Sequence, residues 1–301
     1  MTTDDFIGIN WGSTNFRAYR IGADGTVHDE RNAPAGVAML DRDGMARTLS
    51  EALSDWGDCE HRYATGMIGS NIGWVTVPYV DCPAASIDLL RDDAQVRIAQ
   101  TDVHIVPGLA CTRPDGAPDV LRGEEMELFG ALALSDCAPR YVVLPGTHTK
   151  WVRVEDGRLA DFMTAMSGEI FDRLTAAGLL ASIVDGPAAA DETFAQGVQT
   201  GMAGERGLAV TLFGARARVV QGLLPASKAA SYLRGLLIGA ELLDALRAYP
   251  DLGDSPIVLV GNPALSLLYR DALRIKGLES TIISARDACV AGFTALHRMR
   301  S

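Results

Sequence analysis

The chain has 301 residues, of which 48% are hydrophobic and 22% charged, and this composition indicates a globular protein. Its formal net charge of −11 argues against a nucleic-acid surface, and no apolar run approaches the length of a membrane span. Residues 1–5 lack a basic region and an apolar core, so we expect no signal peptide and a cytoplasmic location. An odd number of cysteines without a Cys-x-x-Cys pair predicts reduced thiols and no metal site: Cys59, Cys82, Cys111, Cys137 and Cys289.

The first pattern is a short apolar run from Ile7 that breaks at Gly12-Ser13-Thr14 and resumes at Phe16. It predicts two antiparallel strands joined by a tight turn over residues 12–15. The backbone N–H groups and hydroxyls of such a turn suit the oxygens of a phosphate, although an ordinary polar turn has the same composition. The spacing matches neither the Lys-bearing P-loop nor the dinucleotide fingerprint.

The remainder of the first half alternates between strand and helix patterns. We expect strands at 26–31, 61–67 and 103–106, helices at 42–56 and 88–100, a loop at 66–74 and another at 112–118. A further helix at 126–135 carries small residues, as does the segment 287–296 near the end of the chain. Two helices with such faces could approach each other closely, or both could be ordinary core helices.

The second half repeats the opening pattern at 141–154, where an apolar strand runs into a turn at Gly146-Thr147 and a second strand follows. We then expect a helix around 171–174, a long one at 227–249, and a buried strand at 257–260 that ends in Gly261-Asn262-Pro263. Two strand–turn–strand loops about half the chain apart indicate a duplicated nucleotide-binding architecture.

Six segments, in order along the chain, resemble the 2-dehydro-3-deoxygalactonokinase family of the sugar kinase, Hsp70 and actin superfamily: 10–17, 66–74, 106–109, 122–125, 145–151 and 166–169. The resemblance implies an α/β, two-lobed actin-like ATPase (ribonuclease H-like) fold with an ATP cleft between the lobes. Residues 1–120 with 286–301 would form the N-terminal lobe, 136–285 the ATP-binding lobe, and 122–135 a connecting helix.

The function that this resemblance implies is ATP-dependent phosphorylation of 2-dehydro-3-deoxy-D-galactonate to its 6-phosphate, with Mg²⁺, in galactonate degradation. A kinase of another sugar or sugar acid, and an ATP-hydrolysing regulatory protein, are the alternatives. The expected partners are the sugar acid and ATP, with no nucleic acid and no membrane, and a homodimer stays open.

Phosphoryl transfer needs a carboxylate that accepts the proton of the acceptor hydroxyl. Glu124 and Glu125 are the candidates, because the resemblance implies a catalytic acid at the head of the helix before the second loop. A helix N-terminus favours the ionised form, yet glutamates in a first turn are also common as caps. Glu169 is a further candidate, and for His148, inside the second loop, we expect a hydrogen-bonding role.

The turns supply the candidates for nucleotide binding, since glycine lets the backbone approach a phosphate closely. They are Gly12, Ser13, Thr14, Gly146, Thr147 and Lys150, with Gly261 at the position that the resemblance implies for adenosine. Position 10 is usually aspartate in the superfamily and helps to hold the hydrated Mg²⁺. Here it is Asn10, which keeps an acceptor oxygen without the charge and is the candidate for the metal.

The sugar acid needs hydrogen-bond partners for its hydroxyls and a cation for its carboxylate. Ser70 and Asn71, with Trp74 as an aromatic wall, form a polar loop suited to a polyhydroxyl chain. Arg17 and Arg122 are the candidates for the carboxylate, because a guanidinium can bind one through two hydrogen bonds.

Overall fold

The computed structural model describes residues 5–136 and 138–300 and separates into two compact units. The first unit contains the described residues up to Ala138, the segment Val154–Asp161 and the residues from Ala285 onward. The second unit contains Pro139–Arg153 and Phe162–Ser284. This grouping differs from the predicted division, because residues 125–134 belong to the first unit and the segment 154–161 joins it as well.

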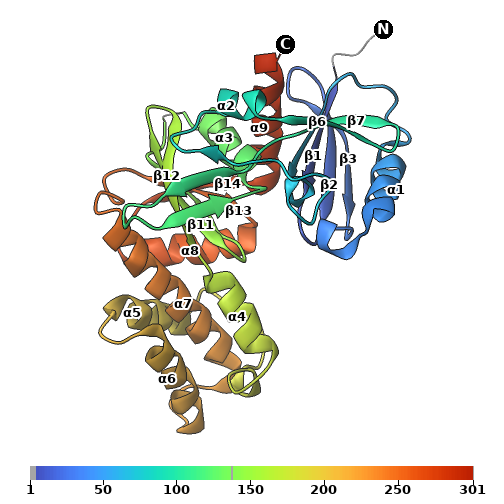
Figure 1. Cartoon of the computed structure of the whole chain (residues 1–301). Helices are drawn as coiled ribbons and strands as arrows, with labels where there is room; N and C mark the ends of the chain where they lie inside the picture. Colours follow the sequence, from blue (N-terminus) through green and yellow to red (C-terminus); the bar gives the residue numbers. More distant parts are fainter. Residues whose placement is uncertain (1–4, 137, 301) are drawn as a thin grey trace. The chain divides into compact units, whose positions relative to one another are not determined.

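The first unit is built on a six-stranded mixed sheet (Figure 1). Across the sheet the strands are β3 (Val27–Ala33), β2 (Phe16–Ile21), β1 (Phe6–Trp11), β4 (Arg62–Gly66), β7 (Thr101–Ile105) and β6 (Ala94–Ile98). The first three form an antiparallel meander, β4 runs parallel to β1, and β7 runs parallel to β4. Strands β1 and β4 are both almost fully buried, as expected for the centre of a sheet with helices nearby.

The second unit repeats this topology. The strands of its sheet, in order, are β12 (Arg158–Ala165), β11 (Thr149–Glu155), β10 (Tyr141–Leu144), β13 (Ile257–Gly261) and β14 (Ser280–Ser284), and the adjoining ends of β11 and β12 are the segment 154–161 that is grouped with the first unit. Strand β11 is antiparallel to β10, whereas β13 is parallel to β10 and β14 is parallel to β13. An antiparallel meander followed by parallel strands therefore occurs twice, which is the duplication that the two Gly-Thr patterns predict.

Four helices accompany the first sheet: α1 (Arg42–Leu53), α2 (Ser86–Arg91), α3 (Glu125–Leu134) and α9 (Ala285–Arg300). The two helices with small residues, α3 and α9, pack directly on each other. A β-carbon at Gly130 would overlap the carbonyl of Ala288, and one at Gly292 would overlap the carbonyl of Met126. The close approach that their composition predicts is confirmed.

The second unit carries α4 (Ser167–Ala176), α5 (Glu192–Ala203), α6 (Leu208–Val220), α7 (Ala226–Ala248) and α8 (Pro263–Ile275). Helices α5 and α7 are in backbone contact, because side chains at four glycines would collide with the facing helix: Gly197, Gly201, Gly235 and Gly239. Helix α8 begins at Pro263, and Asn262 caps it by accepting the N–H of Ala264 at 2.9 Å.

One predicted helix is wrong. Residues 88–100 form the end of short α2 and then strand β6, in which Val96 pairs with Val103 of β7. The run Ala94-Gln95-Val96-Arg97-Ile98 alternates apolar and polar residues, which is the period of a strand. The predicted loop at 112–118 is the turn of a hairpin between β8 (Leu109–Thr112) and β9 (Pro118–Leu121), and β5 (Val80–Asp81) pairs with β8.

No disulfide joins the four cysteines in the described part of the chain, and Cys137 lies outside it. A search of the same residues finds no helix with the length and apolar character that crossing a membrane requires.

Candidate functional site

The first Gly-Ser-Thr turn joins β1 to β2 as predicted, and Gly12 N–H donates to Asn15 O at 2.9 Å. Residues 36–38 cover one side of it: their N–H groups bond the carbonyls of Thr14, Gly12 and Ser13 at 3.0–3.1 Å. In a trans peptide the N–H points opposite to the carbonyl. The N–H groups of residues 13–15 therefore face away from this segment, beside the exposed side chains of Ser13 and Thr14.

The register of the sheet places Asn10 at the carboxyl ends of two parallel strands. Asn10 is opposite Thr65 of β4 and Arg17 of β2, and Trp11 is opposite Gly66. This is the edge of an α/β sheet at which ligands commonly bind. The Nδ2 of Asn10 lies 3.9 Å from Cys289 Sγ on α9, so the amide oxygen is the end left to meet a ligand.

Directly after β4, the loop at 66–77 has a backbone that only glycine accommodates at its first position. Gly66 has φ of +100°, and a β-carbon there would lie 2.6 Å from Trp11 O. The Ser70 hydroxyl donates to Met67 O at 2.7 Å and so closes the turn, whereas Asn71 is exposed. Asn71 is thus better placed than Ser70 to meet a sugar hydroxyl.

The aromatic wall expected at Trp74 is covered on one side. The guanidinium of Arg42 lies 4.3 Å from the centre of the Trp74 ring and donates to Trp74 O at 2.9 Å. This cation–π contact ties the loop to the start of α1.

Arg122 reaches the far end of the same loop. Its Nη2 donates to Val77 O at 2.6 Å, and its guanidinium lies 4.3 Å from the centre of the Tyr79 ring. A β-carbon at Gly69 would lie 2.9 Å from Nη1. Its Nε and Nη1 are buried and have no hydrogen-bond partner in the described structure, so Arg122 holds donor capacity that the protein itself does not use. Arg17, by contrast, is exposed on β2.

The two candidate bases stand side by side at the start of α3 in different environments. Glu125 is fully buried and accepts three hydrogen bonds: from Thr65 Oγ1 at 2.6 Å and from Gly123 N–H at 2.9 and 2.8 Å. Glu124 is the N-cap residue and is only half-buried. Gly123 brings the two glutamates next to the loop at 66–77, since a β-carbon at Gly123 would lie 3.3 Å from the Cα of Gly66.

A third glutamate, Glu127, lies near the other two at this helix end. Burial, and then the neighbouring Glu124 carboxylate, raise the pKa of Glu125 to about 7 and that of Glu127 to about 8. The Arg17 guanidinium opposes the rise at Glu127. The arrangement concentrates carboxylates with raised proton affinity close to the loop at 66–77.

The second Gly-Thr turn joins β10 to β11 in the other unit, with Thr147 and His148 exposed. His148 Nε2 lies 2.7 Å from Glu169 Oε2 on α4, and this hydrogen bond holds the pKa of Glu169 below its usual value. The hydrogen-bonding role expected for His148 is confirmed, and Glu169 is occupied by it. The Nζ of Lys150, a buried residue, donates to His148 O at 3.4 Å.

A glycine on a neighbouring segment covers each turn. A β-carbon at Gly36 would overlap the backbone of Ser13 and Thr14, and one at Gly168 would overlap Gly146 O. At the second turn Glu169 N–H also donates to Thr147 O at 2.9 Å, which fixes the start of α4 against the turn. Gly261 belongs to the same neighbourhood: a β-carbon there would lie 3.3 Å from Pro145 O.

Within residues 5–136 and 138–300, no three His, Cys, Asp or Glu side chains are grouped to hold a metal ion. Mg²⁺ does not need such a group, because proteins often hold it through one or two oxygens together with water and substrate phosphates. Asn10, near the carboxyl end of β1, carries an amide oxygen of this kind.

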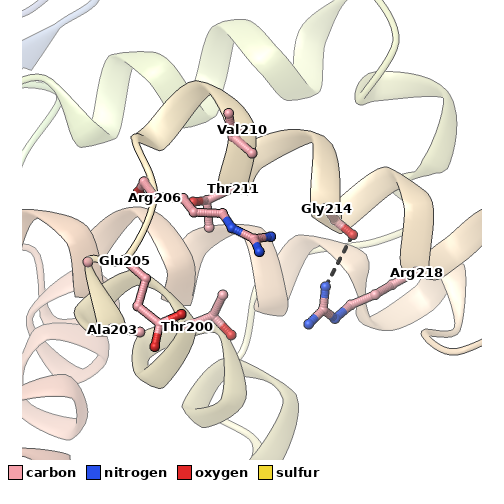
Figure 2. A pocket seen from close by; sticks show the side chains of 9 residues that line it. Thr200, Ala203, Glu205, Arg206, Val210, Thr211, Gly214 and Arg218 are labelled. Atoms are coloured by element: carbon pink, nitrogen blue, oxygen red, sulfur yellow. Dashed lines mark hydrogen bonds between the residues drawn. The ribbon is translucent and has the colours of Figure 1, made fainter.

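The second unit also has a surface pocket of about 300 Å³ between α5 and α6 (Figure 2). Arg206 and Arg218 line it beside Glu205, and Arg218 Nη1 donates to Gly214 O at 3.5 Å. The residues that line this pocket do not include any of the predicted site residues, so the second Gly-Thr turn does not form part of it.

Sequence reasoning missed several residues that support these loops: Thr65, Gly36, Gly168 and the buried Glu241. Glu241 carried a signal, because it interrupts the apolar run Leu236 to Leu243 of the strongest predicted helix. Burial raises its pKa to about 7, although hydrogen bonds from Ser167, Trp151 and Tyr269 oppose the rise. Gly36 carried none, since its neighbours are distant in sequence, whereas Gly168 lies in the family-like segment 166–169.

The chain matches the family model described as 2-keto-3-deoxy-galactonokinase over residues 10–296. It is 33% identical over 295 residues to 2-dehydro-3-deoxygalactonokinase of Escherichia coli (strain K12), a match that covers 98% of each chain. A crystal structure of a candidate 2-dehydro-3-deoxygalactonokinase from Sinorhizobium meliloti superposes with a TM-score of 0.90 at 32% identity, over 98% of this chain and 99% of that one. Component A of (R)-2-hydroxyglutaryl-CoA dehydratase from Acidaminococcus fermentans, with a TM-score of 0.52 at 14% identity, shares the fold alone over 98% of each chain. The predicted α/β actin-like fold class is confirmed.

Proposed function

Because the chain belongs to the 2-keto-3-deoxy-galactonokinase family, we propose that it transfers the terminal phosphoryl group of ATP to the 6-hydroxyl of 2-dehydro-3-deoxy-D-galactonate. The observation that carries this proposal is the family match over residues 10–296, almost the whole chain. The products are ADP and the 6-phosphate, a step of galactonate degradation, and we place the enzyme in the cytoplasm.

We propose that the phosphates of ATP bind at the two Gly-Thr turns. At the first, the N–H groups of residues 13–15 and the exposed hydroxyls of Ser13 and Thr14 supply donors. At the second, Gly146 and Thr147 contribute backbone, and Lys150 adds a positive charge next to the turn. Mg²⁺, held beside Asn10, would neutralise charge on the phosphates during transfer. Gly261, packed next to Pro145, is proposed for the adenosine side.

Glu124 is the proposed base. Glu124 is half-buried, with its Oε2 inside the protein, and is thus less enclosed than Glu125, whose carboxylate is held by Thr65 and Gly123. In the reaction the 6-hydroxyl oxygen attacks the terminal phosphorus, its proton passes to the Glu124 carboxylate, and the bond to ADP breaks.

For the acceptor we propose that Asn71, with Ser70 and Trp74, borders the hydroxyls and that Arg122 binds the carboxylate. The buried Nε and Nη1 of Arg122 support this role, since a carboxylate would satisfy both donors after a small shift of the loop at 66–77. Arg17 is the alternative cation, exposed on β2.

A coupled ADP-release assay over a panel of acceptors tests the substrate. We expect the highest kcat/KM with 2-dehydro-3-deoxy-D-galactonate, and lower values with its gluconate epimer, gluconate and glucose. ADP release with glucose or gluconate but not with the galactonate derivative would reject the acceptor and leave the fold unaffected.

A further inference from the structure

A group of buried polar side chains lies beneath the second Gly-Thr turn, within the second unit. Thr149, Trp151 and Tyr269 are at most 2% exposed, and Ser167 and Glu241 are 7% and 5% exposed. They come from β11, α8, α4 and α7, so four elements meet at one carboxylate.

Three donors converge on Glu241. Trp151 Nε1 donates to Oε1 at 2.7 Å, Ser167 Oγ donates to Oε2, and the Tyr269 hydroxyl lies 3.1 and 3.0 Å from the two oxygens. With Glu241 ionised its oxygens only accept, and the Tyr269 hydroxyl donates to them.

This donation sets the direction of the next bonds. Thr149 Oγ1 lies 2.7 Å from the Tyr269 oxygen, which has already spent its hydrogen, so Thr149 donates. The lone pairs of Thr149 Oγ1 then face Gly146 N–H, 3.5 Å away in the turn. A chain of hydrogen bonds thus runs from Gly146 through Thr149 and Tyr269 to Glu241.

The same carboxylate holds the helix that covers the turn. Ser167 is the first residue of α4, and the next two residues contact the turn: Gly168 against Gly146 O, and Glu169 through its N–H to Thr147 O. Glu241 therefore fixes both the strand that leaves the turn and the helix that packs on it.

We propose that Glu241 is a positioning residue for nucleotide binding, acting on the second Gly-Thr turn through Tyr269–Thr149 and through Ser167. This inference rests on the proposed function in assigning nucleotide phosphates to that turn. A glutamine at 241 has nearly the same shape but replaces one acceptor oxygen by an NH₂ donor, which would face the Trp151, Ser167 or Tyr269 donor.

Calorimetric binding of the ATP analogue AMP-PNP with Mg²⁺, together with KM values for ATP and for the sugar acid, tests the proposal. We expect Glu241→Gln and Tyr269→Phe to weaken AMP-PNP binding and to raise the KM for ATP about 10-fold or more, through displacement of the turn. The KM for the sugar acid should stay within about twofold of wild type, well short of such a displacement effect. Tyr232→Phe is the matched control: it removes a buried hydroxyl that donates to Thr200 at 3.1 Å, on the same helix α7, and should leave nucleotide binding unchanged.

Unchanged AMP-PNP affinity and KM for ATP in a folded Glu241→Gln or Tyr269→Phe variant would overturn the proposal, even if either melts at a lower temperature. Should Glu241→Gln fail to fold, Tyr269→Phe decides alone. A wild type that binds AMP-PNP but phosphorylates no sugar acid would refute the proposed acceptor, and the binding comparison would still stand.

Discussion

Two adjacent glutamates at the start of α3 differ in one respect that separates their roles. Glu125 is enclosed by Thr65 and by the backbone of Gly123, whereas Glu124 is half-buried at the helix cap. Replacing Glu124 by Gln keeps the volume and removes proton acceptance, so we expect kcat to fall by about 10²–10⁴-fold with little change in the KM for ATP. Steady-state kinetics measure both. Near-normal turnover in Glu124→Gln, with turnover lost in Glu125→Gln, would move the base one residue along.

Glu125 makes stability depend on pH. Burial raises its pKa to about 7 in the folded protein from the ordinary glutamate value of 4.5, so between these values the folded chain keeps a proton that the unfolded chain releases. The contribution of Glu125 to stability is therefore present below pH 4.5 and is lost as the pH rises through 7.

A Glu125→Gln variant has no carboxyl group at this position, so it does not lose this stability as the pH rises. We expect its free energy of unfolding to rise relative to wild type by roughly 3 kcal/mol between the acid and the neutral end of that range. Urea unfolding of both proteins at the two ends measures the difference, in which other titrating groups cancel. A difference that does not vary with pH would contradict the raised pKa.

At position 10 the chain carries an amide, Asn10, where the resemblance to the sugar kinase superfamily implies a carboxylate. The contact of Asn10 with Cys289 Sγ is long, at 3.9 Å, so Asn10→Asp removes little from the fold. We expect the aspartate to lower the Mg²⁺ concentration for half-maximal rate and to raise kcat, because a full charge meets the cation. A Mg²⁺ titration of both forms decides this, and identical curves would mean that position 10 does not serve the metal.

At the scale of elements, each of the two Gly-Thr turns packs against a glycine from another segment. In Gly168→Ala the new β-carbon would meet Gly146 O and the backbone of Thr147, which cannot yield as a flexible side chain would. We expect the KM for ATP to rise about tenfold and the free energy of unfolding to fall by about 1–3 kcal/mol.

Gly214→Ala is the control for this substitution. Gly214 lies in α6, and its nearest neighbour would be the end of the Arg218 side chain at 3.5 Å. Alanine there should stabilise by up to about 1 kcal/mol through helix propensity and leave the KM for ATP unchanged. Equal effects of both substitutions on the KM for ATP would argue against a specific role of the α4–turn contact.

The sequence predicted those elements whose pattern is local. Confirmed are the β1–β2 and β10–β11 hairpins, α1, α7 and β13. Apolar periodicity defines the strands and helices, and a glycine turn marks each of the two hairpins. The prediction of one helix at 88–100 failed because a six-residue helix and a five-residue strand adjoin there. Each is too short for its period to dominate the whole segment. Helices α5 and α6 were not predicted.

Candidate site residues were predictable only where a motif carried them. The end of β1 at Trp11, the loop at 66–74 and the residue before Glu124 meet in the first unit through Gly66 and Gly123. Thr65, Gly36 and Gly168 act through contacts with residues 21 to 60 positions away in the chain, which no local pattern reveals.

At the scale of the whole molecule, one topology occurs twice, and each copy ends its first hairpin in a Gly-Thr turn. The family match extends across both halves of this duplicated sheet, and its two turns are where we propose that the phosphates of ATP bind. We therefore expect the protein to transfer the phosphoryl group of ATP to a sugar acid and not to water.

The stoichiometry of phosphorus measures this claim most directly. The protein is incubated with ATP, Mg²⁺ and 2-dehydro-3-deoxy-D-galactonate, and phosphorus NMR follows ADP, inorganic phosphate and the sugar-acid phosphate together. The account predicts one sugar-acid phosphate, esterified at the 6-hydroxyl, for each ADP formed, with little inorganic phosphate. Formation of ADP and inorganic phosphate in equal amounts, at a rate that does not depend on the sugar acid, would contradict it.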